Sequence, residues 1–168
     1  KTILITGASA GIGYHLAKAF ARRGYHLALA ARRLEPLAAL KAEIQQAHPE
    51  LKVEIAALDV AQLDTVAPAV EAFAAQFGGL DIVVANAGVG DGGGMIGTGG
   101  FARDAAVIQI NVLGAMATLD AAIAVFRRQK RGQVVAVASV AAARGLPGAG
   151  AYSTSKAAIA MYADTARS

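Results

Sequence analysis

Short apolar runs alternate with longer amphipathic stretches along the whole chain. The short runs predict buried strands at residues 2–6, 26–31, 53–58, 82–84 and 134–138. The longer stretches predict helices at residues 14–23, after Pro36, at 65–77, at 101–128 and from Ala151 onward. Strands that alternate with helices in this way are typical of an α/β fold with a parallel sheet.

Glycines are concentrated where the first predicted strand meets the first predicted helix, in the sequence Thr6-Gly7-Ala8-Ser9-Ala10-Gly11-Ile12-Gly13. In this context Gly7 would permit a tight turn, Gly11 would let a pyrophosphate approach the backbone, and Gly13 would let the helix pack closely on the strand. Free N–H groups at the start of the helix, that of Ile12 included, would bind the phosphates. We interpret the segment as a dinucleotide-binding turn.

Two arginines, Arg32 and Arg33, follow the second predicted strand, where a dinucleotide fold meets the adenosine ribose. An NAD-selective site generally has an acidic residue there. A guanidinium instead suits a 2′-phosphate, because it donates two parallel hydrogen bonds, and Ser9 could add a second phosphate contact. We therefore predict NADP(H) in preference to NAD(H). The alternative is a solvated arginine pair ahead of a helix.

Ser139, Tyr152 and Lys156 are the candidate catalytic residues. Ser139 ends the last predicted strand, at the edge where open α/β sheets bind ligands. Tyr152 and Lys156 are four residues apart on a predicted helix and share one face. A cation beside the phenol would favour the phenolate, and Ser139 could hydrogen-bond a substrate oxygen. By spacing alone such a pair is more often a solvated surface pair, so the interpretation depends on the other motifs.

Together these motifs resemble the short-chain dehydrogenase/reductase family, in the branch with Thr-Gly-x-x-x-Gly-x-Gly and Tyr-x-x-x-Lys. Asn86-Ala87-Gly88 resembles its Asn-Ala-Gly element, and Ala10 stands where the epimerase-type branch has glycine, which argues against that branch. The resemblance implies one Rossmann-type catalytic domain over residues 1–168. It also implies a doubly wound parallel sheet of strand order 3-2-1-4-5, with helices on both faces.

The resemblance further implies roles for single residues. Asn111, Ser139, Tyr152 and Lys156 match the catalytic tetrad, in which Tyr152 would be the general acid/base, Lys156 would also hold the ribose, and Asn111 would bind a relay water. Asp59 matches an aspartate that meets the adenine, although a turn or helix cap is an equal alternative. The resemblance implies further cofactor contacts at Val60, Asn86, Ala87 and Gly88, with Asn86 also tying the central sheet together.

Composition excludes several other classes of protein. The chain has no cysteine, which removes disulfides and thiolate chemistry and is compatible with a reducing, cytoplasmic setting. His15, His26 and His48 lack metal-ligand spacing, so we expect no metal. The net charge of +4 is mild and mostly scattered, so we expect no nucleic acid. Residues 105–126 are apolar but interrupted by Gln109, Asn111 and Asp120, which predicts a buried or interface helix and no membrane span.

The implied reaction is reversible hydride transfer between NADP(H) and a carbonyl or secondary alcohol. Steroid, sugar, acyl thioester and simple ketone substrates all stay open. The alternatives are a non-catalytic NADP(H)-binding module and, among enzymes, a 3-oxoacyl-carrier-protein reductase. The carrier-protein hypothesis would use the basic residues 127–131 for docking, although these are most simply cations at a helix C-terminus.

Three further expectations concern the rest of the molecule. The apolar helices predict a homodimer or homotetramer. The glycine-rich stretch 90–100 predicts a mobile loop beside the active site, with low complexity as the alternative. Family members continue past the helix of Tyr152 into a further strand and a substrate-covering loop, so we expect the sequence to be truncated within that helix.

Overall fold

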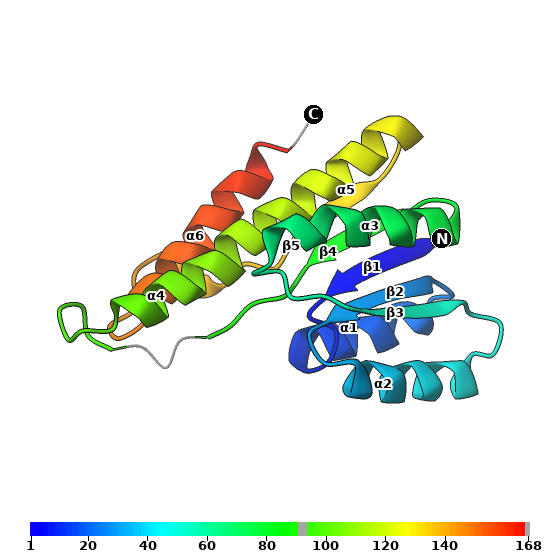
Figure 1. Cartoon of the computed structure of the whole chain (residues 1–168), viewed down its shortest axis with the longest axis horizontal. Coiled ribbons are helices and arrows are strands. Elements are labelled where there is room, and N and C mark those ends of the chain that lie inside the picture. The colour runs from blue at the N-terminus through cyan, green and yellow to red at the C-terminus, as the bar shows by residue number, and fades with distance from the viewer. Residues whose placement is uncertain (91–93, 167–168) are drawn as a thin grey trace.

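Five parallel strands form a single sheet in the order β3-β2-β1-β4-β5 (Figure 1). The computed structural model describes residues 1–90 and 94–166. The strands are β1 (Thr2–Thr6), β2 (His26–Ala31), β3 (Val53–Ala57), β4 (Ile82–Ala85) and β5 (Gln133–Ala136). The predicted α/β fold, its strand order and its parallel pairing are confirmed.

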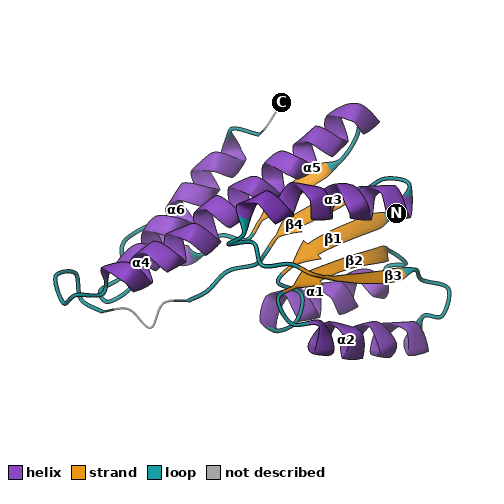
Figure 2. Ribbon diagram, viewed as in Figure 1, coloured by secondary structure: helices purple, strands orange, loops and turns teal. Residues whose placement is uncertain are grey.

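Helices cover both faces of this sheet (Figure 2). They are α1 (Gly11–Ala21), α2 (Leu34–Ala47), α3 (Leu63–Phe77), α4 (Phe101–Ile108), α5 (Ala115–Gln129) and α6 (Gly150–Asp164). A π-helical turn, η1 (Gln109–Gly114), joins α4 to α5 in one long helix, and a 3₁₀ turn, η2 (Val140–Ala142), follows β5. In Figure 1, α1 and α2 lie on one side of the sheet, and α3 and α5 lie on the other.

The alternation of side chains along the central strands supplies a core to each face. Ile3 and Ile5 of β1 belong to the cluster packed with α1 and α2, whereas Leu4 between them packs with α3 and α5. Every residue of β1 is buried, because the strand has a neighbour on each side and helices on each face. This arrangement explains why the strands are continuous apolar runs in the sequence.

The long helix 101–129 differs from its prediction in two respects. It is interrupted by η1, where Asn111 and Gly114 are buried. It is also long and apolar enough to cross a membrane by length and composition, although we expected its polar residues to prevent this. Core helices of soluble domains meet the same criterion, and here α5 packs on β4, β5 and α3.

The first helix and the last strand differ from their predicted bounds, because tertiary packing sets where they begin and end. The first helix begins at Gly11 and not at residue 14, so its first turn lies within the glycine-rich turn. The last strand is residues 133–136 and not 134–138, and it is only half-buried, because it is an edge strand that pairs with β4 alone. Ser139 therefore lies beyond the strand, at the N-cap of η2.

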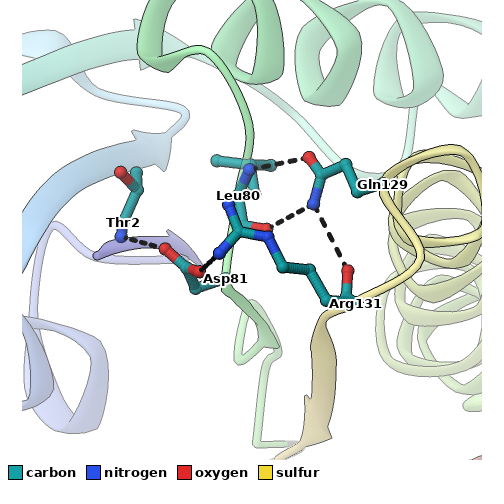
Figure 3. Close-up of polar contacts among 5 residues, drawn as sticks. All are labelled: Thr2, Leu80, Asp81, Gln129 and Arg131. Atoms are coloured by element: carbon teal, nitrogen blue, oxygen red, sulfur yellow. Dashed lines mark hydrogen bonds and ion pairs between the residues drawn. The ribbon is translucent and has the colours of Figure 1, made fainter.

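A polar cluster joins the starts of the strands (Figure 3). The Asp81 carboxylate accepts hydrogen bonds from the Thr2 N–H, at 2.7 Å, and from Arg131, at 3.0 Å. The Gln129 side chain binds both the N–H and the C=O of Leu80, at 3.0 and 2.7 Å. The basic cluster 127–131 thus lies where the strands begin, at the end of the sheet away from the strand C-termini.

Candidate active site

A cleft of about 480 Å³ opens at the C-terminal ends of the strands. It lies where the strand order reverses between β1 and β4, the usual ligand position in doubly wound sheets. Tyr152 and Lys156 line it, together with nearly all the residues predicted to contact the cofactor: Gly7, Ser9, Gly11, Ile12, Arg32, Arg33, Asp59, Val60, Asn86, Ala87 and Gly88. Gly13, Asn111 and Ser139 are not among its lining residues.

The glycine turn is shaped by close backbone contacts. A Cβ on Gly7, whose φ is 69°, would lie 2.7 Å from the Cα of Ala87. A Cβ on buried Gly13 would lie 2.5 Å from the carbonyl oxygen of Gly7. Above Gly11, by contrast, a Cβ would meet no atom within 4 Å. The turn is therefore tightly packed at Gly7 and Gly13 and open to the cleft at Gly11.

The open side of this turn carries the start of α1. The N–H groups of its first turn have no partners within the helix, and that turn contains no acidic residue. Ile12, 61% exposed, stands beside them and lines the cleft. Unpaired N–H groups with the positive end of a helix dipole fit a pyrophosphate.

Asn86 ties β1 to β4 beneath the cleft. Its Nδ2 donates to the carbonyl oxygens of Thr6, at 2.9 Å, and Gly7, at 3.2 Å. The Thr6 hydroxyl oxygen in turn accepts from the N–H groups of Asn86 and Ala87, both at 3.2 Å. These bonds hold Ala87 against Gly7, where the space for a side chain is absent.

Arg32 and Arg33 lie at the far end of the cleft, past β2. Both are exposed, and neither guanidinium makes a hydrogen bond or ion pair with any residue of the described ranges 1–90 and 94–166. Half-buried Ser9 lines the same cleft. Asp59 also lines it, but its Oδ1 accepts a hydrogen bond from the Ala61 N–H at 3.1 Å, so it closes a turn as the alternative interpretation had it.

Tyr152 and Lys156 enter the cleft from α6. The Lys156 Nζ lies 5.8 Å from the centroid of the Tyr152 ring and donates to the Val137 carbonyl oxygen at 2.8 Å. The lysine is 7% exposed, and burial lowers its pKa below the ordinary value. A Cβ on Gly88 would lie 3.6 Å from this Nζ, so the ammonium is held close to the backbone that follows β4.

Asn111 is buried in η1, behind the cleft wall. Its Oδ1 accepts from the Val89 N–H at 2.8 Å, and its Nδ2 donates to the Val89 carbonyl oxygen at 2.9 Å and to the Ser155 Oγ at 3.1 Å. A Cβ on Gly88 would lie 3.1 Å from Asn111 Oδ1. Asn111 therefore joins the long helix both to the segment after β4 and to α6.

Ser139 lies at the side of this arrangement. It is half-buried, and its Oγ accepts from the Ala141 N–H at 3.2 Å, which caps η2. Its neighbour Ala138 lines the cleft. The loop that follows is tied to α6 by the Ser153 Oγ, which accepts from the Leu146 N–H at 3.2 Å.

Three residues that hydrogen-bond Asn111 or Lys156 were not predicted from the sequence: Val89, Val137 and Ser155. Val89 and Val137 contribute backbone atoms, which residue type does not mark. Ser155 lies within the Tyr-x-x-x-Lys motif, but nothing in its identity distinguishes it from exposed Thr154. Within the predicted loop 90–100, residues 91–93 lie outside the described residues. The described ranges contain no group of three or more His, Cys, Asp or Glu suited to a metal.

Known proteins match this chain over almost its whole length. A family model described as short chain dehydrogenase matches residues 1–168. An uncharacterized oxidoreductase of Myxococcus xanthus is 44% identical over 172 residues, covering 99% of this chain and 65% of that protein. The NADP-dependent 3-hydroxy acid dehydrogenase of Schizosaccharomyces pombe is 32% identical, covering 99% and 64%. The chain thus spans just under two thirds of these relatives.

Solved structures match as closely. An alcohol dehydrogenase from Thermococcus sibiricus, complexed with 5-hydroxy-NADP, superposes with a TM-score of 0.92 at 34% identity, covering 98% of this chain and 69% of that one. An NAD⁺-bound xylitol dehydrogenase superposes with a TM-score of 0.94 at 31% identity, covering 99% and 63%. The two hold different nucleotides, so they leave the choice between NAD and NADP to the residues of this chain.

Proposed function

The chain belongs to the short-chain dehydrogenase family of oxidoreductases, and from this premise we propose that it is the NADP(H)-binding and catalytic part of an enzyme that interconverts a carbonyl and a secondary alcohol. One observation carries the proposal: Tyr152 and Lys156 line the same cleft as the glycine turn and the two arginines. The nucleotide, when bound, supplies or accepts the hydride. It fits because the turn is open above Gly11 while Gly7 and Gly13 keep it tight.

The residues of the first half of the chain bind the nucleotide. N–H groups at the start of α1 bind the pyrophosphate, since no side chain or acidic group competes there. Arg32 and Arg33 bind the 2′-phosphate, since both are exposed, line the cleft and have guanidinium groups without a partner in the described ranges. Asp59 and Val60 border the adenine end.

The residues of the second half move the proton. In the reducing direction Tyr152 donates its phenolic proton to the substrate oxygen, and in the oxidising direction it takes that proton back. The Lys156 ammonium beside the ring favours the phenolate and holds the ribose. Ser139 hydrogen-bonds the substrate oxygen, and Asn111 binds a relay water behind Lys156.

The alternatives gain no support from the site. A non-catalytic module would bury the Lys156 amine at a desolvation cost without using it. Docking of a carrier protein on the basic cluster is disfavoured by its distance from the cleft, because the cluster lies where the strands begin. Arg128 and Arg131 are moreover already paired with Glu71 and Asp81.

We also propose a cytoplasmic homodimer or homotetramer. Phe101 of α4 and Met161 of α6 are 81% and 69% exposed, and these two helices lie together (Figure 1). Exposed apolar side chains on adjacent helices are typical of subunit interfaces. Light scattering at micromolar concentration should give a multiple of the monomer mass, and a monodisperse monomer would contradict this.

The function is tested by titrating the full-length protein with NADPH and NADH, followed by fluorescence, and then by assaying NADPH oxidation with a panel of ketones, sugars, steroids and acyl thioesters. Tight NADPH binding, weak NADH binding and turnover of a carbonyl substrate are expected. Equal affinity for both nucleotides would remove the argument from Arg32 and Arg33. Nucleotide binding without turnover of any substrate would favour the non-catalytic module.

A further inference from the structure

Ser155 is completely buried although it carries a hydroxyl, and it lies between Tyr152 and Lys156 in the sequence of α6. Its Oγ donates to the Tyr152 carbonyl oxygen at 2.7 Å, three residues earlier in the helix. The same oxygen accepts from the Asn111 Nδ2 at 3.1 Å. A hydroxyl has a single hydrogen, so once that hydrogen is given to Tyr152 the oxygen can meet Asn111 only as an acceptor.

Asn111 carries this contact onward to the cleft wall. Its amide binds both the N–H and the C=O of Val89, at 2.8 and 2.9 Å. Val89 lines the cleft directly after Asn86-Ala87-Gly88. A continuous series of hydrogen bonds thus runs from the Tyr152 carbonyl through Ser155 and Asn111 to Val89.

Asn111 and Lys156 lie so close to Gly88 that α6 has little room to move toward it. A Cβ on Gly88 would lie 3.1 Å from Asn111 Oδ1 and 3.6 Å from Lys156 Nζ. A shift of α6 relative to Gly88 would therefore move Tyr152 and Lys156 with respect to whatever occupies the cleft. Misplacement of reacting groups by about 1 Å can reduce a rate about a hundredfold.

We propose that Ser155 is a positioning residue, which through Asn111 fixes the depth of α6, and with it Tyr152 and Lys156, against the cleft wall at Gly88 and Val89. The inference rests on the function proposed above. Ser155 itself does not line the cleft, so it acts through Asn111 and not on the substrate or the nucleotide.

The test uses the full-length protein with Ser155→Ala and Ser155→Cys. For Ser155→Ala we expect kcat to fall about tenfold to hundredfold and the NADPH Kd to change far less, because the reacting groups are displaced while the phosphate contacts remain. Ser155→Cys keeps the shape but has a weak acceptor, so its loss should be smaller. If the alanine variant does not fold, Ser155→Cys is used for the same measurements.

Ser153→Ala is the matched control, because Ser153 is a buried serine of the same helix that binds Leu146 and not Asn111. It should lower thermal stability about as much as Ser155→Ala does but leave kcat near the wild-type value. An equal loss of kcat in both variants would reduce Ser155 to a general structural role and overturn the proposal.

Two measurements follow the contact itself. In a double-mutant cycle, Ser155→Ala should cost little further kcat once Asn111→Ala is present, because both remove the same contact. Hydrogen exchange of the Asn111 side-chain amide, followed by NMR, should become at least about tenfold faster in Ser155→Ala. Additive losses or unchanged exchange would overturn the inference. The exchange rate shows whether the Ser155–Asn111 contact is present even if the protein turns over no carbonyl substrate. Absence of turnover would refute the proposed function and not this contact.

Discussion

The two walls of the cleft differ in whether their polar side chains are already hydrogen-bonded to the protein. On the wall built by α1 and the end of β2, the side chains of Arg32 and Arg33 are exposed and have no partner in the described parts of the chain. On the wall built by β4, η1 and α6, the polar groups of Asn86, Asn111 and Lys156 are all bonded to protein atoms. The first wall presents groups that a ligand can complete, whereas the second is already organised by the fold.

This difference separates what each wall contributes. Side chains that find their hydrogen-bonding partner only in a ligand should control the affinity for that ligand. Side chains that are already hydrogen-bonded within the protein should control the rate or the stability, because their bonds exist before binding and are lost on unfolding. Substitutions on the two walls should therefore have separable effects.

The largest effect is expected from Tyr152→Phe in the full-length protein. Loss of the phenolic proton should lower kcat by about 10³-fold, within the range for a general acid/base, while the NADPH Kd stays unchanged. Steady-state kinetics and a fluorescence titration measure the two quantities. Tyr162→Phe, on the same helix, is the control and should be fully active. Near-normal turnover of Tyr152→Phe would remove the catalytic role from the second wall.

On the first wall, Arg32→Ala with Arg33→Ala should raise the NADPH Kd by at least about tenfold to hundredfold, since even one hydrogen bond to a charged group contributes about 1.5–3 kcal/mol. The NADH Kd and the saturated kcat should not change. The exposed pair at the end of α1 is the matched control, and Arg22→Ala with Arg23→Ala should leave the NADPH Kd unaltered. Equal weakening of NADPH and NADH would contradict a 2′-phosphate contact.

Gly13→Ala tests the packing beneath the two walls. The new Cβ would lie 2.5 Å from the Gly7 carbonyl oxygen and 2.6 Å from the Asn86 Nδ2. We expect the free energy of unfolding to fall by about 1–3 kcal/mol in urea denaturation, and NADPH binding to weaken with it. Gly100→Ala, where a Cβ meets nothing within 4 Å, should be neutral. Full stability of Gly13→Ala would show that the turn can relax.

The smallest effect is a pH dependence on the second wall. Burial lowers the pKa of Lys156, so the unfolded chain binds this proton more tightly than the folded protein does. The free energy of unfolding therefore gains a contribution that rises with pH, from the folded pKa up to the ordinary lysine value of about 10.4. Lys156→Met lacks this contribution, so the free energy of unfolding of the wild type should rise relative to that of the variant as pH rises. A difference that is constant with pH in urea denaturation would contradict it.

Much of the fold follows from local patterns. Apolar runs of strand length between amphipathic stretches indicate parallel strands linked by helices, and the glycine spacing after β1 fits one compact turn. The strand order 3-2-1-4-5 is instead implied by the family resemblance that the glycine turn, Asn-Ala-Gly and Tyr-x-x-x-Lys carry, and the sheet has this order. These motifs also selected many of the residues that line the cleft. The glycine turn, the two arginines and Asn-Ala-Gly each follow a strand, and these strand ends meet at one edge of the parallel sheet, where α6 adds Tyr152 and Lys156.

Other features depend on which residues face one another after folding. The start of α1 at Gly11, the shortness of β5 and the place of Ser139 beyond it are set by hydrogen bonds and edge position, which no single segment specifies. The burial of Ser155 depends on Asn111, 44 residues away. Val89 and Val137 serve through backbone atoms. The chemical groups of the site, and the edge of the sheet at which they gather, could be predicted from the amino-acid sequence. Their depth, pairing and solvation could not, because these depend on neighbours that are distant in the chain and meet only in the folded protein.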